Sequence, residues 1–294
     1  MGVKLRRVKP RFHQYRYQIV PIDRHGQAAN FEDHSTEELV ARKNEFFWDA
    51  IQQIDVQLSG RSITSRIAAM SDPRAMLQLA VERDLKVGRR DFTEDVVENW
   101  PQIFVLFDND PEVQTCFIED RKQAFSSTKT VAQALEEAFG KLLFRYGLTV
   151  SFNPIYDEEY FWKLVDRHRG QVTRVEFTLV TPNMPSISRK VRQLMDNVGQ
   201  ATDAEVTKLA LVSDPKGALF LDPENETLKT LVEYSSDGGG ETKVKVRGLK
   251  LKSTSQGICD VSIDELNFEG FNVGETMRIF GGWIDPTDTD GPDA

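Results

Sequence analysis

Basic residues recur at close intervals in the segment ETKVKVRGLKLKS, toward the C-terminal end of the chain. Lys and Arg alternate there with Val and Leu, a period of two that predicts a β-strand with one basic face. Cations along an extended strand can follow a phosphate backbone, so this face is a candidate nucleic-acid contact. The residues that we expect to make it are Lys243, Lys245, Arg247, Lys250 and Lys252. An edge strand protected from aggregation by lysines shows the same pattern, and the sequence leaves that alternative open.

A second basic stretch, KLRRVKPRFHQYRYQ, lies near the N-terminus. It interleaves cations with Phe and Tyr, a composition suited to phosphates and stacked bases. Its candidate phosphate contacts are Arg6, Arg7, Lys9 and Arg11. A solvated arm with no ligand is the alternative interpretation.

Motifs for catalysis are absent from the sequence. Its four histidines form no His-x-x-x-His pair, and it contains neither a Gly-x-Ser-x-Gly elbow nor a phosphate-binding loop of the Gly-x-x-x-x-Gly-Lys-Ser/Thr type. Carboxylates do cluster, and a metal-dependent nuclease needs such groups, but turn residues and helix N-termini account for them more simply. The clusters are Asp108 with Asp110, Glu119 with Asp120, and Asp157 with Glu158 and Glu159. We therefore name no catalytic residue, no metal ligand and no cofactor.

Composition limits the class of protein. The chain has 294 residues and 39% hydrophobic residues, enough for a buried core without disulfides. Its two cysteines, its lack of a long apolar run and its lack of a secretory signal lead us to expect a cytoplasmic protein. A net charge of −9 argues that any nucleic-acid site is local and does not extend over the whole surface.

Hydrophobic periodicity predicts a mixture of strands and helices. We expect strands at Tyr15–Pro21, at Leu148–Pro154 and at Gln171–Thr181, and a hairpin formed by WPQIFVLF and VQTCFIED. Helices are expected from Ser35, whose hydroxyl would cap the first turn, over Thr128–Tyr146 and over Asp157–Arg169.

Other segments carry weaker patterns. The region 59–98 is mixed, with a helix expected at Pro73–Arg83, and another helix is expected at Ser186–Asn197. Ala201–Leu211 fits either a helix or a strand, and the Gly-rich run Asp237–Gly240 predicts a hairpin turn.

The irregular order of these elements favours an α+β fold with mixed or antiparallel sheets, packed helices and two subdomains. We expect an N-terminal α+β region over residues 1–100, consisting of a strand, a long amphipathic helix and the mixed segment. A central and C-terminal α+β domain would cover residues 101–284. The acidic tail, residues 285–294, is expected to be disordered.

The middle of the chain resembles known proteins in the order of its elements and in a few short strings. These strings are VLFDNDPEVQTCFIEDRKQAFSS, LTVSFNPIYDEE and QVTRVEFTLVTPNMPSISRKVRQLMDNVGQATDAE. From Ile103 to Leu251 the chain resembles phage-exclusion and anti-phage defence proteins of the RexA and KwaB type. The resemblance implies an intracellular α+β protein that binds DNA and acts with a membrane partner or another effector. It implies no chemistry and assigns no residue.

Three hypotheses follow. The first is a DNA-binding component of a prokaryotic anti-phage defence system that acts by binding duplex DNA. Its partner would be a membrane protein or another effector of the same system, and the chain would form homo-oligomers. The second is a protein–protein adaptor or oligomeric toxin component without nucleic-acid contact, with Phe161–Trp162 as a contact. The third is a metal-dependent nuclease that uses the acidic clusters.

Overall fold

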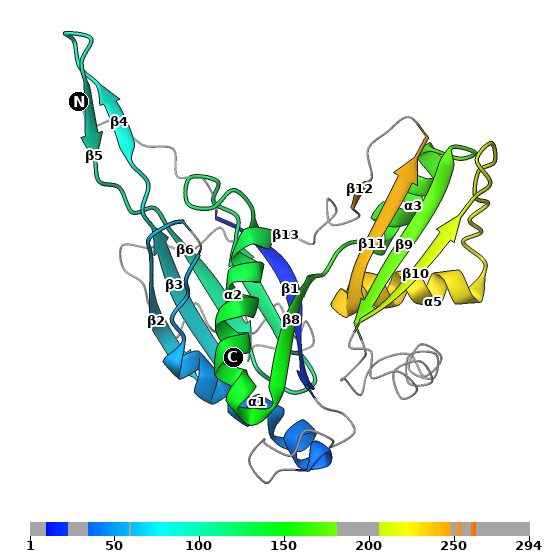
Figure 1. The fold of residues 1–294 in the computed structure, drawn as a ribbon, viewed down its shortest axis with the longest axis horizontal. Helices are drawn as coiled ribbons and strands as arrows, with labels where there is room; N and C mark the ends of the chain where they lie inside the picture. The colour runs from blue at the N-terminus through cyan, green and yellow to red at the C-terminus, as the bar shows by residue number, and fades with distance from the viewer. Residues whose placement is uncertain are drawn as a thin grey trace, which may run out of the picture.

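The computed structural model describes residues 10–22, 35–58, 60–180, 206–247, 252–253 and 260–262. These residues form four α-helices and three antiparallel sheets, which confirms the α+β class (Figure 1). Of the helices in these ranges, none combines the length and hydrophobicity that crossing a bilayer requires.

The largest sheet has seven strands. Its order is β13-β1-β7-β6-β3-β2, and β8 also pairs with β1. The strands are β1 (Arg11–Pro21), β2 (Ile63–Ser71), β3 (Arg74–Val81), β6 (Gln102–Asp108), β7 (Thr115–Glu119), β8 (Leu148–Pro154) and β13 (Asp260–Ser262). The expected hairpin is therefore confirmed as β6 and β7, and the first strand begins four residues earlier than its pattern indicates.

Two helices, α1 (Thr36–Gln53) and α2 (Thr128–Leu143), pack on one face of the large sheet (Figure 1). The Ser35 hydroxyl accepts the Glu38 N–H and caps α1, as expected. The 3₁₀ turn η1 (Phe144–Tyr146) follows α2. Aromatic rings fill the space between the layers, with Phe47 stacked on Tyr17 at 4.5 Å and packed on Phe139 at 4.6 Å between ring centroids.

The prediction of a helix at Pro73–Arg83 is wrong, because residues Arg74–Val81 form strand β3. Its Ala, Met, Leu and Gln residues are good helix formers, but β3 lies between β2 and β6, and both faces of the strand are buried. Burial on both faces removes the alternation that marks a strand in a sequence. Tertiary pairing has therefore overridden local propensity.

The second sheet has four strands in the order β10-β9-β11-β12. Its strands are β9 (Val172–Val180), β10 (Val206–Val212), β11 (Gly240–Val246) and β12 (Lys252–Ser253). The helices α3 (Glu158–Arg167) and α5 (Glu226–Tyr234) cover one face, where Phe161, Phe177 and Val232 are fully buried. The ambiguous Ala201–Leu211 segment thus contributes a strand.

The Gly-rich run does not form a hairpin turn, so that prediction is wrong. Leu228–Tyr234 belongs to helix α5, and the π-helical turn η2 (Ser235–Gly239) joins this helix to β11. Gly238 has a φ of +81° and lies against β1, where a Cβ atom would be 2.5 Å from the Cβ of Arg16. The Gln18 amide donates to the Gly238 carbonyl at 3.3 Å, so η2 is the junction between the two sheets.

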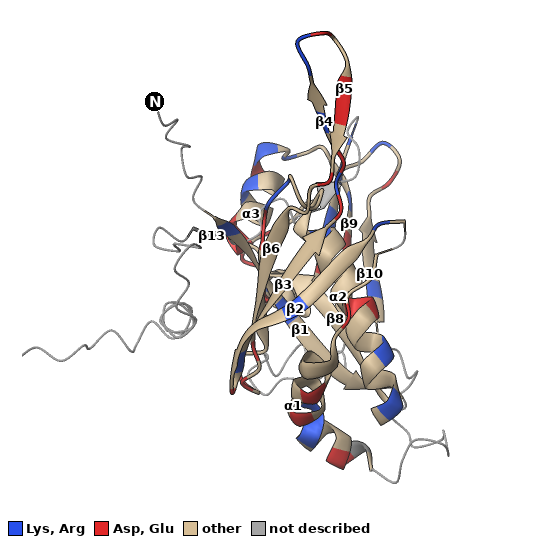
Figure 2. Ribbon diagram, turned by 90° about the vertical axis from the view of Figure 1, so that its left-hand side faces the viewer, with Lys and Arg blue, Asp and Glu red and all other residues tan. Residues whose placement is uncertain are grey.

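A short hairpin, β4 (Leu85–Gly88) and β5 (Glu94–Val97), projects from the large sheet (Figures 1 and 2). All its residues except Asp95 are exposed, and Phe92 near its tip is 98% exposed. Figure 2 shows basic residues on one side of the tip and acidic residues on β5.

The expected boundary between residues 100 and 101 falls inside the large sheet, because β3 and β6 pair across it. The two sheets instead separate after β8, and of the described strands that follow β8 only β13 belongs to the large sheet. The expected helix Ser186–Asn197 and the expected disordered tail, residues 285–294, lie outside the described residues.

Candidate nucleic-acid interface

The basic strand of the sequence is β11, and its alternation is confirmed. Thr242, Val244 and Val246 are buried on the face that packs on the helices. Lys243 and Lys245 are half-buried and lie on the opposite face. Of the five residues predicted to form one basic face, Lys243 and Lys245 therefore share a face of β11.

Carboxylates occupy the same face. Lys243 Nζ lies 3.0 Å from the Glu241 carboxylate, and Lys129 of α2 reaches that carboxylate at 3.3 Å. Glu176 of β9 is the register partner of Lys243 and forms an ion pair with Arg174. We call Arg174, Glu176, Glu241, Lys243 and Lys245 the β11 face. Its cations lie beside acids that compete with phosphate for them.

The other expected basic residues do not extend this face. Arg247 is exposed at the end of β11 and donates to the carbonyls of Lys216 and Gly217, at 3.1 and 2.6 Å. Lys252 of β12 is the register partner of Val244, so its position is out of phase with Lys243. Arg11 begins β1 in the large sheet. Lys250, Arg6, Arg7 and Lys9 lie outside the described residues.

Strand β11 pairs with β9 along its length and with β12 at Lys243 and Val244. Among the described strands β12 is the edge on this side and carries Lys252, so the edge-strand interpretation of the lysines stays open. The edge of the sheet on the other side is β10, which carries a single lysine.

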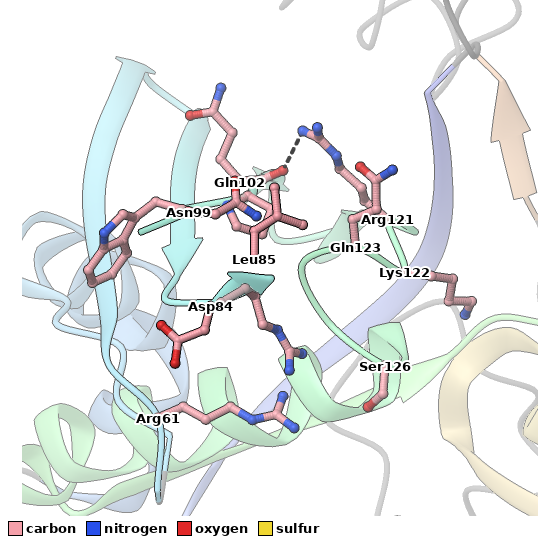
Figure 3. Close-up of a pocket in the computed structure, with 12 residues that line it drawn as sticks. Arg61, Asp84, Leu85, Asn99, Gln102, Arg121, Lys122, Gln123 and Ser126 are labelled. Carbon is pink, nitrogen blue, oxygen red and sulfur yellow. Dashed lines mark hydrogen bonds between the residues drawn. The ribbon is translucent and has the colours of Figure 1, made fainter. Parts of the chain in front are cut away.

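A different basic site lies at the base of the β4–β5 hairpin. It is a pocket of about 860 Å³, open to solvent, which we call the hairpin-base pocket (Figure 3). Its lining residues are Arg61, Arg83, Asp84, Leu85, Asn99, Trp100, Pro101, Gln102, Arg121, Lys122, Gln123 and Ser126. Four of them are cations and one is an acid, in a chain whose net charge is −9.

Sheet topology brings these cations together. Arg61 precedes β2, Arg83 follows β3, and Arg121 and Lys122 follow β7. Because neighbouring strands are antiparallel, the start of β2 and the ends of β3 and β7 lie at the same end of the sheet. Figure 3 shows Arg61 and Arg121 reaching the pocket from opposite sides.

The two best-anchored arginines of the pocket bind neutral groups. Arg83 donates twice to the Ala124 carbonyl, from Nε at 3.1 Å and from Nη2 at 2.8 Å. Arg121 donates to the Gln102 carbonyl at 3.0 Å (Figure 3). A carbonyl orients a guanidinium group without cancelling its charge, so both remain available to an anion.

The remaining two cations differ in their surroundings. Lys122 pairs with Asp120 at 2.8 Å, although its side chain is 64% exposed. Within the ranges that the structure describes, the Arg61 side chain has neither a hydrogen bond nor an ion pair. Trp100 adds an aromatic ring at the rim, 37% exposed and held by a hydrogen bond from its indole N–H to Glu98.

Glu119 is a buried acid near this end of the sheet. It accepts the Phe104 N–H at 3.0 Å and is 8% exposed. Burial raises the pKa of its carboxyl from 4.5 to about 7, against smaller opposite effects of the Phe104 hydrogen bond and of Arg121.

The acidic clusters of the sequence have structural partners. Asp108 pairs with Arg74 at 2.8 Å, and Asp157 accepts the Glu159 N–H as the N-cap of α3. Within the described ranges, no three His, Cys, Asp or Glu side chains gather closely enough to hold a metal ion.

Sequence reasoning missed the pocket. Its cations are spread over residues 61 to 122, and no local pattern connects them. The one local signal is the pair Arg121–Lys122, which begins two residues after an apolar strand that ends at Glu119. The sequence gives no signal at Arg83, because it predicts a helix where β3 precedes this residue.

Comparisons with known proteins add no identity. No family model matches the chain, and no curated protein gives a significant match.

Proposed function

We propose that this protein binds duplex DNA and that the hairpin-base pocket holds the phosphates. The observation that carries the proposal is the convergence of Arg61, Arg83 and Arg121 with Lys122 around an open pocket that contains one acid. Phosphate contacts by Arg and Lys supply most of the affinity of non-specific DNA binding. Guanidinium groups held by carbonyls are oriented in advance, which lowers the entropy lost on binding.

The hairpin above the pocket fits the same function by shape. A two-stranded ribbon matches the width of the DNA major groove. Between residues 85 and 97 it carries three cations and three acids, so it contributes little net charge. Arg90 and the fully exposed Phe92 lie at its tip, where a groove or a base step would be met first.

The biological setting of the proposal rests on the resemblance to RexA and KwaB type proteins. We propose that the chain acts in the cytoplasm as the DNA-binding component of an anti-phage defence system, together with a partner protein of that system. Loss of phage protection in cells that carry the pocket variants described next would support this setting. Unchanged protection would contradict it, even where the purified protein binds DNA.

Fluorescence anisotropy with a labelled duplex at several salt concentrations tests DNA binding. If three to four phosphates are contacted, the logarithm of affinity should fall with the logarithm of salt with a slope of about −3. The double variant Arg61→Gln, Arg121→Gln should reduce that slope by about 2. Lys243→Gln, Lys245→Gln is the matched control and should leave it unchanged. An affinity that does not change with salt concentration contradicts the proposal. If only the control variant lowers the slope, the phosphates bind at the β11 face and not at the pocket.

A protein–protein adaptor remains the second candidate, and one observation favours it. Leu85, Val87 and Val97 lie on the same face of the hairpin and are 51%, 42% and 47% exposed. Apolar side chains gathered in this way are typical of a protein contact. If Val87→Ser abolishes phage protection while the double variant Arg61→Gln, Arg121→Gln retains it, the adaptor function is supported.

A further inference from the structure

Strand β10 is an exposed edge of the four-stranded sheet with unusual composition. Its seven residues, VTKLALV, contain one charge and no proline. Val206, Leu209 and Val212 are 42%, 36% and 62% exposed. Protein edges are commonly protected by charges, prolines or bulges, because an unprotected edge pairs with another strand. We propose that β10 pairs with β10 of a second copy of this chain, forming a homodimer with one continuous sheet.

The backbone of β10 is oriented for such pairing. Ser213 donates its N–H to the Thr173 carbonyl at 2.9 Å, which fixes the phase of the hydrogen bonds between β10 and β9. Hydrogen-bonded pairs alternate with non-bonded pairs along an antiparallel ladder. Thr207, Leu209 and Leu211 therefore bond to β9. The N–H and C=O groups of Lys208, Ala210 and Val212 point outward, toward a partner strand.

Charge selects one register among those that the outward groups allow. With Lys208 opposite the partner's Lys208, two like charges face each other, which is destabilising. If Lys208 lies opposite the partner's Val212, the neighbouring strand β9 of the partner places Arg174 beside that Val212, and so on the same face as Lys208. Both arrangements bring cations together on one face of the sheet.

The register centred on Leu209 avoids this repulsion. It places Lys208 opposite the partner's Ala210, whose own neighbour on β9 is Glu176. Two strand spacings separate Lys208 from the partner's Glu176, about 10 Å between Cα atoms, and the small Ala side chain lets the two charged groups approach. The same register pairs Val206 with the partner's Val212 and includes all seven residues.

This arrangement is self-complementary, as a two-fold dimer requires, because each contact occurs twice. The second copy is therefore the partner that the edge fits. The dimer does not depend on DNA binding, but it would carry two hairpin-base pockets and so raise the affinity for a long duplex.

Sedimentation equilibrium of the full chain tests the dimer. Wild-type protein should dimerise with a dissociation constant in the micromolar range. Ala210→Lys places two lysines opposite each other at both symmetry-related positions and should weaken the dimer about tenfold. Ala218→Lys, at an exposed position in the loop after β10, adds the same charge as a matched control and should have no effect. A wild-type chain that stays monomeric at about 100 µM, or a dimer unaffected by Ala210→Lys, overturns the proposal.

Disulfide trapping tests the register in a chain whose Cys259 is replaced by serine. In the proposed register Leu209 faces the partner's Leu209 in a non-hydrogen-bonded pair, with Cα atoms about 4.5 Å apart. Leu209→Cys should therefore give a covalent dimer under mild oxidation, and Ala210→Cys should give much less. The reverse result overturns the register, and no covalent dimer from either variant overturns the pairing of β10 strands.

Discussion

Two regions of this protein gather lysines and arginines, and they treat those charges differently. On the β11 face, Lys243 lies 3.0 Å from Glu241, and Arg174 pairs with Glu176. In the hairpin-base pocket, Arg83 and Arg121 donate to the neutral carbonyls of other segments. Both regions would look basic in a count of cations. Only the second region holds two of its cations, Arg83 and Arg121, by neutral acceptors that leave their charge uncompensated.

The difference shows that the acceptor determines what a basic residue can do. A carboxylate partner lowers the gain from binding a phosphate, because the ion pair must be broken or shared. A carbonyl partner restricts the side chain without that competition. Regions such as the β11 face are therefore best understood as mixed-charge surfaces of a sheet.

The buried acid beside the pocket gives the largest expected effect on stability. The pKa of Glu119 is raised to about 7 in the folded protein, so the neutral form is favoured by folding. The protonated Glu119 carboxyl adds roughly 3 kcal/mol to the free energy of unfolding. This contribution is fully present below pH 4.5 and is lost as the pH rises through 7. Glu119→Gln should remove this part of the pH dependence, as measured by urea unfolding of both proteins across that range. A constant difference between them at every pH would contradict the account.

Arg83 tests whether carbonyl anchoring organises the pocket. Arg83→Met keeps the apolar stem but removes two hydrogen bonds to Ala124, and should lower the free energy of unfolding by about 2 kcal/mol. Arg61→Met is the matched control and should change stability by less than about 0.5 kcal/mol. Denaturant unfolding measures both. Equal effects on stability would remove the distinction between an anchored and an unanchored arginine.

Removing the acids of the β11 face should leave its cations without competing carboxylates, as with the two anchored arginines of the hairpin-base pocket, and so make them better able to bind phosphate. Glu176→Gln with Glu241→Gln releases Arg174 and Lys243 and should raise affinity for duplex DNA by about fivefold. Glu137→Gln with Glu159→Gln changes the net charge equally on two helices and should have a smaller effect. Anisotropy titrations compare the pairs. Equal gains would mean that net charge alone determines binding, and not the pairing on this face.

Much of the fold could be predicted because the patterns are local. The alternation of β11, the apolar runs of β6 and β7 and the Ser35 cap each occur within a few residues. β3 could not be recognised, because burial on both faces removes the period on which strand prediction depends. The sequence predicts a hairpin turn at the Gly-rich run, and this prediction is wrong because the preceding residues form helix α5 and not a strand.

The candidate site could be predicted only in part. That Lys243 and Lys245 share a face follows from their spacing, but the acid opposite Lys243 is Glu176, 67 residues away in β9. The pocket depends on which strand ends meet, and strand order is not a local property. Long-range pairing therefore determines the accumulation of charge at the pocket, whereas the ion pairs Lys243–Glu241 and Arg174–Glu176 on the β11 face join residues two positions apart in one strand.

Lysine acetylation of the native protein, measured by mass spectrometry with and without a duplex, tests the central claim most directly. The account predicts that DNA protects Lys122 at the hairpin-base pocket, while Lys243 and Lys245 are modified at unchanged rates. Protection of Lys243 and Lys245 with no protection of Lys122 would contradict it and would place the phosphates on the β11 face.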